Sequence, residues 1–383
     1  MLNLTSLDLA ERIICAADRI HPADAVLRDQ LKAPRRFSPD EATQVSRAVF
    51  AFYRWQGWLD QTQPIHAQFE QALELNETFA RQSDTFSESD LIARAVPAWI
   101  RTEMDVTPAW ARALQAEPKL WLRARPGQGA ALAAKLRRSH LFGEGLLSDI
   151  LEYRGGQDLF RTPAFHDGEF EVQDLSSQAV GLICNPQAGE TWWDACAGEG
   201  GKLLHLSDLM QNKGLIWASD RAGWRLQRLK RRTARAKAFN YRSAVWDGGP
   251  KLPTKTKFNG VLVDAPCSGV GTWQRNPHAR WTTTAQDVSE LGEVQKQLLA
   301  HAASAVKPGG MLIYAVCTLT RSETLEVMKS FESHSPEFEP LPMLNPLLPE
   351  SPAVAANWFW PQDFGGNGMF VACWKRSGAR RQP

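Results

Sequence analysis

Residues 191–210 read TWWDACAGEGGKLLHLSDLM, which places a short apolar strand, a turn of small residues and a helical pattern in succession. Further apolar strands that end in turns follow in GLIWASD at 214–220, SAVWD at 243–247, FNGVLVDAPCSG at 258–269 and GGMLIYAVCTL at 309–319. Strands that alternate with helical stretches imply parallel βαβ units. The sequence therefore predicts an α/β domain with a doubly wound sheet over residues 171–383.

The chain before this sheet divides into two further regions. Apolar residues recur at helical spacing through most of residues 1–90, and Ser38 with Glu41 three positions later forms a capping box that begins a helix. We expect an all-helical domain there. Residues 91–170 mix helical patterns with short strand-like segments, which predicts a small α+β subdomain.

The composition argues against a membrane protein and against an exported one. Apolar residues make up 43% and charged residues 22% of the chain, and no apolar run approaches the roughly 20 residues of a membrane helix. The first twenty residues carry Asp8 and Glu11 within their apolar pattern, unlike a secretory signal. The cysteines form no C-x-x-C pair, so no metal site is expected. We expect a soluble, cytoplasmic protein of undetermined oligomeric state.

The turn DACAGEGGK at 194–202 has the composition of a ligand-binding turn. Small residues there let a ligand approach the backbone and the exposed N–H groups of the following helix; they are Ala195, Ala197, Gly198, Gly200 and Gly201. Tight turns also need glycine when no ligand binds, so the turn alone leaves both interpretations open. It is not a phosphate-binding P-loop, because Lys202 is not followed by Ser or Thr.

Two aspartates end the strand-like segments that follow this turn. Asp220 ends GLIWASD about 20 residues past the glycine turn, where an acid that binds a ribose is expected in a nucleotide-binding fold. A helix N-cap is the alternative role, and one residue can serve both. Asp247 ends SAVWD in the same way and could accept a hydrogen bond from an adenine amino group.

Two cysteines follow the ends of the next two strands. Cys267 lies three residues after Asp264 in GVLVDAPCSG, and Cys317 ends the strand-like segment MLIYAVC. Free cysteine is often just a small buried apolar residue, and we favour that interpretation for Cys15, Cys184 and Cys373. Cys267 and Cys317 are different because neighbouring parallel strands would bring them to the same edge of the sheet.

A run of basic residues begins near Asp220. Eight of them lie within eighteen positions, namely Arg225, Arg228, Lys230, Arg231, Arg232, Arg235, Lys237 and Arg242. Such a run could follow the phosphates of a nucleic acid, and it could equally be the solvated face of a helix.

These motifs resemble those of the RNA cytosine-5 methyltransferase family of Nop/Sun type, and more narrowly its bacterial 16S ribosomal RNA branch with a NusB-like N-terminal domain. The strongest match is DAPCSGVGTWQRNPHARW at 264–281. Four further stretches agree with the family pattern in their order along the chain, namely FEVQDLSSQAV at 170–180, DACAGEGGK at 194–202, YAVCTLTRSE at 314–323 and NGMFVACW at 367–374. DEATQVSRAVFAFYRWQGWLDQ at 40–61 resembles NusB more weakly. The resemblance implies a Rossmann-like class I methyltransferase sheet, preceded by a NusB-like helical domain and a small α+β RNA-binding subdomain.

The resemblance also implies catalytic roles. Cys317 would add its thiolate to carbon 6 of a cytosine, which makes carbon 5 able to attack a methyl sulfonium. Asp264 would hydrogen-bond ring nitrogen 3, and Lys202 would orient Asp264 or the base. Cys267 would help to remove the carbon 5 proton and release the product. RNA, in particular 16S rRNA with the target base out of its stack, is the implied partner.

S-adenosyl-L-methionine is the implied cofactor. The turn would line its methionine portion through Cys196, Ala197, Gly198, Glu199, Gly200, Gly201 and Lys202, close to Asp264. Asp220 would bind the ribose with Arg225 nearby, and Asp247 would bind the adenine.

The chain departs from the family pattern at a few positions. Glu199 stands where Pro is usual, Val316 where Thr is usual and Thr324 where Asn is usual, and Gln274 and His278 replace Arg and Asp. Two other functions therefore stay open, namely methylation of tRNA and RNA binding by an inactive ribosome assembly factor. The joint presence of both cysteines with Asp264 and Lys202 favours an enzyme.

Overall fold

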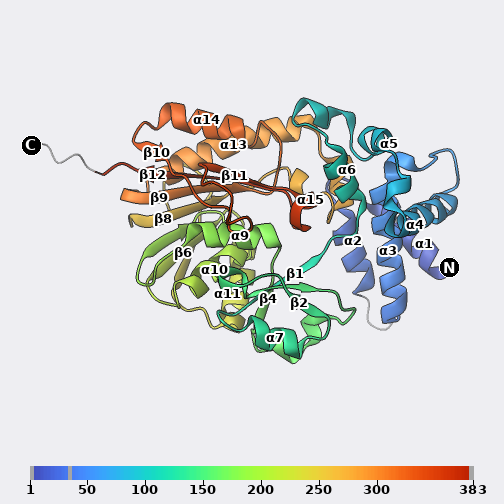
Figure 1. The fold of residues 1–383 in the computed structure, drawn as a ribbon, viewed down its shortest axis with the longest axis horizontal. Coiled ribbons are helices and arrows are strands. Elements are labelled where there is room, and N and C mark those ends of the chain that lie inside the picture. Colours follow the sequence, from blue (N-terminus) through green and yellow to red (C-terminus); the bar gives the residue numbers. More distant parts are fainter. Residues whose placement is uncertain (1–3, 33–36, 379–383) are drawn as a thin grey trace, which may run out of the picture. The chain divides into compact units, whose positions relative to one another are not determined.

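The computed structural model describes residues 4–32 and 37–378, which group into two compact units (Figure 1). The helical unit takes its residues from 1–118, 268–288 and 360–365. The sheet unit takes its residues from 119–267, 289–359 and 366–383. Each unit is thus built from segments that lie far apart in the sequence. The expected domain boundaries near residues 90 and 170 stay a prediction.

The helical unit confirms the expected helical start of the chain. Its helices are α1 (Leu4–Ala16), α2 (Ala23–Leu31), α3 (Pro39–Trp55), α4 (Ile65–Arg81), α5 (Glu88–Arg94), α6 (Pro108–Gln115), α12 (Pro277–Thr282) and α15 (Pro361–Phe364). The predicted capping box begins α3, since Glu41 N donates to Ser38 Oγ at 3.2 Å and Ser38 N donates to Glu41 Oε2 at 2.8 Å. The core between these helices includes the buried rings of Trp55, Phe69 and Trp110.

Arg280 belongs to the second half of the stretch 264–281, which resembles the family most strongly. It is fully buried inside the helical unit. Its guanidinium donates to backbone carbonyls of Ala95 at 3.0 Å and Leu114 at 2.9 Å, and more weakly to those of Arg54 and Trp273 at 3.3 Å. Burial, followed by the charge of Arg54, lowers its pKa to about 9. This arginine holds backbone segments together, which gives the second half of the match a structural task.

The sheet unit begins with a small antiparallel sheet of order β2-β3-β1-β4. Its elements are β1 (Leu120–Ala124), α7 (Gly129–Lys135), β2 (Ser139–Leu141), β3 (Ile150–Tyr153), α8 (Pro163–His166) and β4 (Phe170–Val172). Leu122, Leu151 and Phe170 are fully buried in a core of its own. The α+β pattern predicted from this part of the sequence is therefore present.

The large sheet has the order β10-β12-β9-β8-β5-β6-β7, with β11 paired to β12. Its strands are β5 (Thr191–Asp194), β6 (Leu215–Asp220), β7 (Tyr241–Val245), β8 (Phe258–Asp264), β9 (Val306–Val316), β10 (Phe338–Pro340), β11 (Ala356–Phe359) and β12 (Met369–Arg376). The run from β9 to β7 is parallel, whereas β12 and β10 are antiparallel to their neighbours. The predicted doubly wound sheet is confirmed, with an antiparallel edge added.

Helices cover both faces of the large sheet (Figure 1). They are α9 (Leu175–Cys184), α10 (Gly201–Leu209), α11 (Gly223–Ala236), α13 (Ala285–Ala303) and α14 (Leu325–His334). In Figure 1, α13 and α14 lie on one side of the strands, and α10 and α11 lie on the other. Apolar side chains of β5, β8 and β9 fill the core between these layers, as a buried parallel sheet requires.

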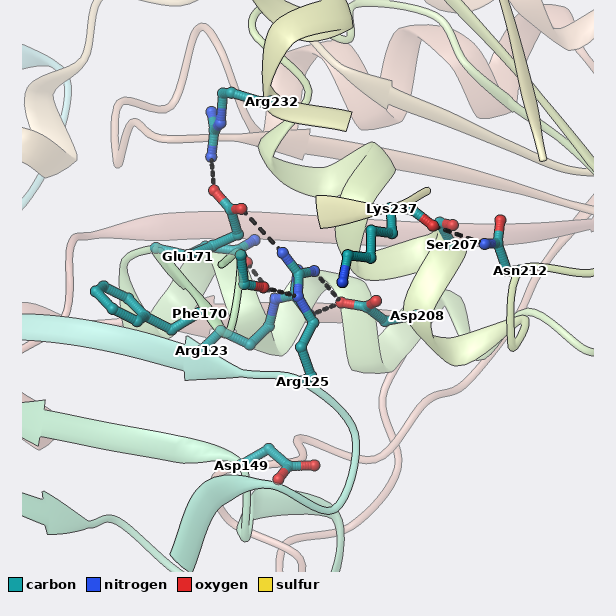
Figure 2. Close-up of polar contacts among 12 residues, drawn as sticks. Arg123, Arg125, Asp149, Phe170, Glu171, Ser207, Asp208, Asn212, Arg232 and Lys237 are labelled. Carbon is teal, nitrogen blue, oxygen red and sulfur yellow. Dashed lines mark hydrogen bonds and ion pairs between the residues drawn. The ribbon is translucent and has the colours of Figure 1, made fainter. Parts of the chain in front are cut away.

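A cluster of arginines and acids joins the small sheet to α10 and α11 (Figure 2). We call it the arginine cluster, and it consists of Arg123, Arg125, Glu171, Asp208, Arg232 and Arg235. Glu171 accepts from Arg125 at 3.0 Å, Arg232 at 2.8 Å and Arg235 at 2.6 Å. Asp208 accepts from Arg125 at 2.9 Å and also pairs with Arg123. These bonds connect β1 and β4 to the helices beside the large sheet.

No helix among residues 4–32 and 37–378 is both long enough and apolar enough to cross a bilayer.

Candidate active site

A cavity of about 590 Å³ opens where the parallel strands of the large sheet end. The chain runs outward from β5 through β6 to β7 on one side and through β8 to β9 on the other, so the strand order reverses between β5 and β8. Ligands bind at such a reversal, beyond the carboxyl ends of the strands. The volume lies within the range of small-molecule and cofactor pockets.

The cavity gathers nearly all the site residues that the sequence predicts. Its lining includes Cys196, Ala197, Gly198, Glu199, Gly201, Lys202, Asp220, Arg225, Asp247, Asp264, Cys267 and Cys317. Gly200 is not among the lining residues. It is the N-cap of α10 at a φ of 89°, and a Cβ there would lie 2.9 Å from Leu229 Cγ. Close packing against α11 and the left-handed backbone explain this glycine.

Lys202 and Asp264 form an ion pair inside the cavity. Lys202 Nζ donates to Asp264 Oδ2 at 2.7 Å, and the two side chains are 9% and 29% exposed. Burial lowers the pKa of the Lys202 ammonium, but the charge of Asp264 and the hydrogen bond to it, helped by Cys317 and Asp194, raise it overall. Lys202 is therefore a charged donor that holds Asp264 in place.

The two predicted cysteines lie side by side. Cys267 Sγ is 3.2 Å from Cys317 Sγ, which is hydrogen-bonding distance for two sulfurs. The strand register explains the approach, because β8 and β9 are neighbours with Asp264 opposite Ala315, so the loops that leave them start together. Cys196 also lines the cavity, but burial followed by the charge of Asp194 raises its pKa strongly and keeps it a thiol.

The predicted ribose acid is held by backbone. Asp220 Oδ2 accepts from Gly198 N at 3.1 Å, and its Oδ1 accepts from Ala222 N at 2.8 Å. Arg225 Nη1 lies 3.8 Å from Asp220 Oδ2. Each carboxylate oxygen can accept a second hydrogen bond, so Asp220 is fixed in place and still able to bind hydroxyl groups. It joins the glycine turn to the start of α11.

Apolar side chains, which we call the apolar wall, also line the cavity together with Asp247, namely Trp246, Leu291, Val294 and Leu298. A flat apolar group with an amino edge would find packing surface and a hydrogen-bond acceptor there. Together with the backbone-held Asp220, this lining suits a cofactor that has a ribose and an adenine, such as S-adenosyl-L-methionine.

Asp194, the first residue of the glycine turn, is a buried acid that the sequence interpretation gave no role. Its carboxyl group is fully buried, and the backbone N–H of Leu203 acts on it as a hydrogen-bond donor. Burial, followed by the charge of Asp264, raises its pKa to about 8, while Lys202 opposes the rise. Its place at the carboxyl end of β5 was the signal that could have drawn attention to it.

A buried hydrogen-bond network behind the cysteines was also not predicted. Gln295 Nε2 donates to the carbonyl of Pro266 at 2.8 Å, next to Cys267, and to Glu323 Oε1 at 2.9 Å. Glu323 Oε2 accepts from Thr318 Oγ1 at 3.0 Å, next to Cys317. The Tyr314 hydroxyl donates its one proton to the Glu323 carbonyl at 2.6 Å, and its oxygen also lies 2.9 Å from Gln295 Oε1. The network therefore connects the two cysteine loops from behind.

The departures from the family pattern have identifiable surroundings. Glu199 pairs with Arg228 at 2.6 Å. Val316 is buried in β9 opposite Phe370, and Thr324 donates to the Thr320 carbonyl at 2.6 Å.

Gln274 and His278 belong to the helical unit. Gln274 donates to the Ala116 carbonyl at 3.4 Å, and the His278 ring packs edge-on against Tyr53 with centroids 4.7 Å apart. None of the departures lies within the ion pair or the cysteine pair.

Comparison with known proteins identifies the family. The profile described as "16S rRNA methyltransferase RsmB/F" matches residues 181–375, about half of the chain and most of the large sheet with its cavity. The chain belongs to the RsmB/F family.

Curated members of the RsmB/F family are similar over part of their length. A probable ribosomal RNA small subunit methyltransferase B of Bacillus subtilis is 35% identical over 223 residues, covering 57% of this chain and 50% of that protein. A probable ribosomal RNA small subunit methyltransferase B of Synechocystis is 41% identical over 174 residues, covering 44% of this chain and 38% of that protein. A ribosomal RNA small subunit methyltransferase B of Shewanella oneidensis is 31% identical over 261 residues, covering 64% of this chain and 59% of that protein. The chain thus spans about half the length of the curated relatives it matches.

Solved structures share the fold. The crystal structure of PH0851 has a TM-score of 0.80 at 21% identity and covers 98% of this chain and 99% of its own. NSun6 from Pyrococcus horikoshii, solved with SFG, has a TM-score of 0.61 at 17% identity, covering 71% and 94%. A methyltransferase homolog from Pyrococcus horikoshii has a TM-score of 0.60 at 22% identity, and the match covers 79% of this chain and 99% of that chain. The expected class I methyltransferase fold is confirmed.

Proposed function

We propose that this chain methylates carbon 5 of a cytosine in RNA, with 16S rRNA as its substrate, through a covalent cysteine adduct and with S-adenosyl-L-methionine as methyl donor. One observation carries the proposal. The sulfurs of Cys267 and Cys317 lie 3.2 Å apart in the same cavity as the Lys202–Asp264 pair. Two thiols, a carboxylate and an ammonium at the end of a methyltransferase sheet are the groups that this reaction needs.

The residues of the cavity suit the cofactor. The turn from Cys196 to Lys202 would hold its methionine portion, Asp220 with Arg225 its ribose, and Asp247 with the apolar wall its adenine. When bound, the cofactor supplies an electrophilic methyl group. Every remaining step falls to side chains of this chain.

The chemistry divides between the two cysteines. The thiolate of Cys317 forms a bond to carbon 6, and the electron pair of the 5,6 double bond moves to carbon 5, which takes the methyl group. Lys202 holds one carboxyl oxygen of Asp264, and the other takes up a proton when the base binds and donates it to ring nitrogen 3, where negative charge develops. Cys267 removes the carbon 5 proton, and the sulfur–carbon 6 bond then breaks to restore the double bond.

A ribosomal substrate is supported by the family and by the names of the three relatives above, each of which refers to ribosomal RNA. The helical start of the chain, which resembles NusB, supports the same branch. In this proposal residues 1–90, 91–170 and 171–383 act as helical, RNA-binding and methyltransferase domains in the cytoplasm. A tRNA substrate and an inactive assembly factor are the alternatives that the following experiments address.

The substrate is tested with tritiated S-adenosyl-L-methionine and total RNA from a strain that lacks the gene. We expect label in 16S rRNA, and bisulfite sequencing then gives the cytosine. Label in tRNA alone would contradict the substrate assignment. Absence of label in all RNA, with retained RNA binding, would favour the inactive factor.

The adduct is tested with two cysteine variants. Cys317→Ala should abolish transfer because no thiolate attacks carbon 6. Cys267→Ala should accumulate a covalent RNA–protein complex on a denaturing gel, because proton removal and release are blocked. Cys15→Ala, an exposed cysteine of the helical unit, is the control and should behave as the unchanged protein. Accumulation with Cys317→Ala instead would reverse the two roles.

A further inference from the structure

Trp224, the second residue of α11, is unusual among the tryptophans of this chain. All of them lie within the described residues, and Trp224 is the single exposed one, at 55%. Large aromatic side chains are mostly buried because they carry much apolar surface. Exposure leaves this ring available to a binding partner, and what surrounds it decides whether it has one.

Two arginines hold the ring beside the cavity. The Arg225 guanidinium lies 5.4 Å from the Trp224 ring centroid, and the Arg228 guanidinium lies 4.9 Å from it. Arg225 also approaches Asp220 at 3.8 Å, and Arg228 pairs with Glu199 at 2.6 Å. Asp220 and Glu199 both line the cavity. The ring is thus connected through Arg225 and Arg228 to two residues that line the cavity, although it does not line the cavity itself.

The surface around Trp224 is basic. Arg221 is exposed and lines the cavity just before α11 begins. Arg228 and Arg231 are exposed four and seven residues after Trp224, which is the spacing of one helix face. Val245, also exposed, lies beside Gly223 at the end of the edge strand β7. An aromatic ring and a short apolar edge thus lie among positive charges that extend along α11.

We propose that Trp224, with Arg225 and Arg228, forms a stacking platform for an unpaired nucleotide that neighbours the target cytosine in the RNA. Proteins bind single-stranded RNA by stacking bases on aromatic rings and guanidinium planes while basic groups contact the phosphates. Because Arg225 belongs to both the platform and the cavity wall, the stacked base is a near neighbour of the base in the cavity. This inference rests on the proposed function.

The proposal is tested with short fluorescein-labelled single-stranded RNAs that contain one cytosine. In one series an abasic nucleotide replaces each neighbour of that cytosine in turn. For the unchanged protein, one abasic position should weaken binding, measured by fluorescence anisotropy, by roughly 5- to 100-fold. Trp224→Ala should weaken binding of the intact RNA by a similar factor and should show no further loss at that position. Trp224→Phe should restore most of the affinity.

Two controls separate stacking from other effects. Phe239→Ala removes another exposed aromatic, 72% exposed, that does not line the cavity, and should leave RNA affinity unchanged. The salt dependence of binding should be the same for Trp224→Ala and the unchanged protein, since no charge is removed.

Three results would overturn the platform. These are full RNA affinity in Trp224→Ala, abasic losses in Trp224→Ala equal to those of the unchanged protein, or a matching loss of S-adenosyl-L-methionine affinity by calorimetry, which would make Trp224 part of the cofactor wall. If the unchanged protein binds no RNA, the proposed function fails as well. Failure of the platform alone leaves methyl transfer by the unchanged protein intact.

Discussion

The sheet unit contains two groups of buried ion pairs that differ in how completely their acids are bonded. In the arginine cluster, Glu171 is 2% exposed and accepts hydrogen bonds from three arginines, of which Figure 2 labels Arg125 and Arg232. In the cavity, Asp264 is 29% exposed, and Lys202 holds one of its oxygens. The first acid has no room for a ligand, whereas the second faces a cavity large enough for one.

This difference indicates what each group does. A buried acid whose oxygens are all occupied is costly to remove, because its removal leaves partner charges unpaired. An acid that is held by one donor and open on its other side can bind a substrate without rearrangement, which is how preorganised sites act. The arginine cluster therefore serves stability, and the Lys202–Asp264 pair serves binding and chemistry. Substitutions in each of the two groups test that division.

Glu171→Ala should lower the free energy of unfolding by about 3–5 kcal/mol, because three partly buried guanidiniums lose their common buried acceptor. Urea unfolding followed by circular dichroism measures this. Glu169→Ala is the matched control, since Glu169 pairs with Lys135 near the surface and its loss should cost less than about 1 kcal/mol. The kcat of the folded Glu171→Ala protein should stay close to that of the unchanged protein. Equal costs for the two variants would contradict the assigned role of the cluster.

Asp264→Asn should show the opposite pattern. We expect kcat to fall by about 100- to 1,000-fold, because the group that meets developing charge on the base is lost. The unfolding free energy should fall by less than in Glu171→Ala, because the Asn amide oxygen can still accept from Lys202, whereas Glu171→Ala removes the acceptor of three arginines. Single-turnover methylation and urea unfolding on the same preparations compare the two effects. A stability loss as large as that of Glu171→Ala, with an unchanged rate, would end the distinction.

Gln295→Leu should lower kcat by roughly tenfold, because Gln295 connects the Pro266 carbonyl to Glu323 and so keeps the two cysteine loops in register. The KM for RNA and the affinity for the cofactor should stay unchanged, since Gln295 does not line the cavity. Steady-state kinetics measure kcat and the KM for RNA separately and so test both expectations. A raised KM with an unchanged kcat would show that the network acts on binding.

Asp194→Asn should alter the pH dependence of stability. Burial, followed by the charge of Asp264, raises the pKa of Asp194 to about 8, so the folded state keeps a proton that the unfolded state has released between about pH 4 and pH 8. The unfolding free energy of the unchanged protein should therefore fall as pH rises through this window. The unfolding free energy of Asp194→Asn should fall less over the same pH range, as measured by urea unfolding at both ends of the window. Identical pH profiles would mean that Asp194 is ionised throughout.

Much of the sheet and its cavity could be predicted from local sequence. Each parallel strand is a short apolar run, and the residues directly after these runs, such as Asp220, Asp264 and Cys317, reach the same edge because parallel strands end together. The capping box at Ser38 was equally readable because it depends on four consecutive residues. Predictions of this kind need only spacing and residue type.

Features that depend on distant partners could not be predicted. Glu171 meets Arg125 and Arg232 from two other elements, and no spacing in the sequence relates them. The match at 264–281 reads as one continuous motif, yet it divides at Cys267, and Arg280 packs inside the other unit. Gly200 reads as part of a ligand-binding turn, although its need for glycine comes from Leu229 on the next helix.

The short separation of Cys267 Sγ and Cys317 Sγ, 3.2 Å, makes the site sensitive to oxidation. Hydrogen peroxide converts one thiolate to a sulfenic acid, and the neighbouring thiol then condenses with it to form a disulfide and water. Both sulfurs would be consumed in one bond, so cytosine could neither be attacked nor released. A thiol reductant would reverse the reaction. Purification without a reductant would yield folded protein that is inactive in methyl transfer.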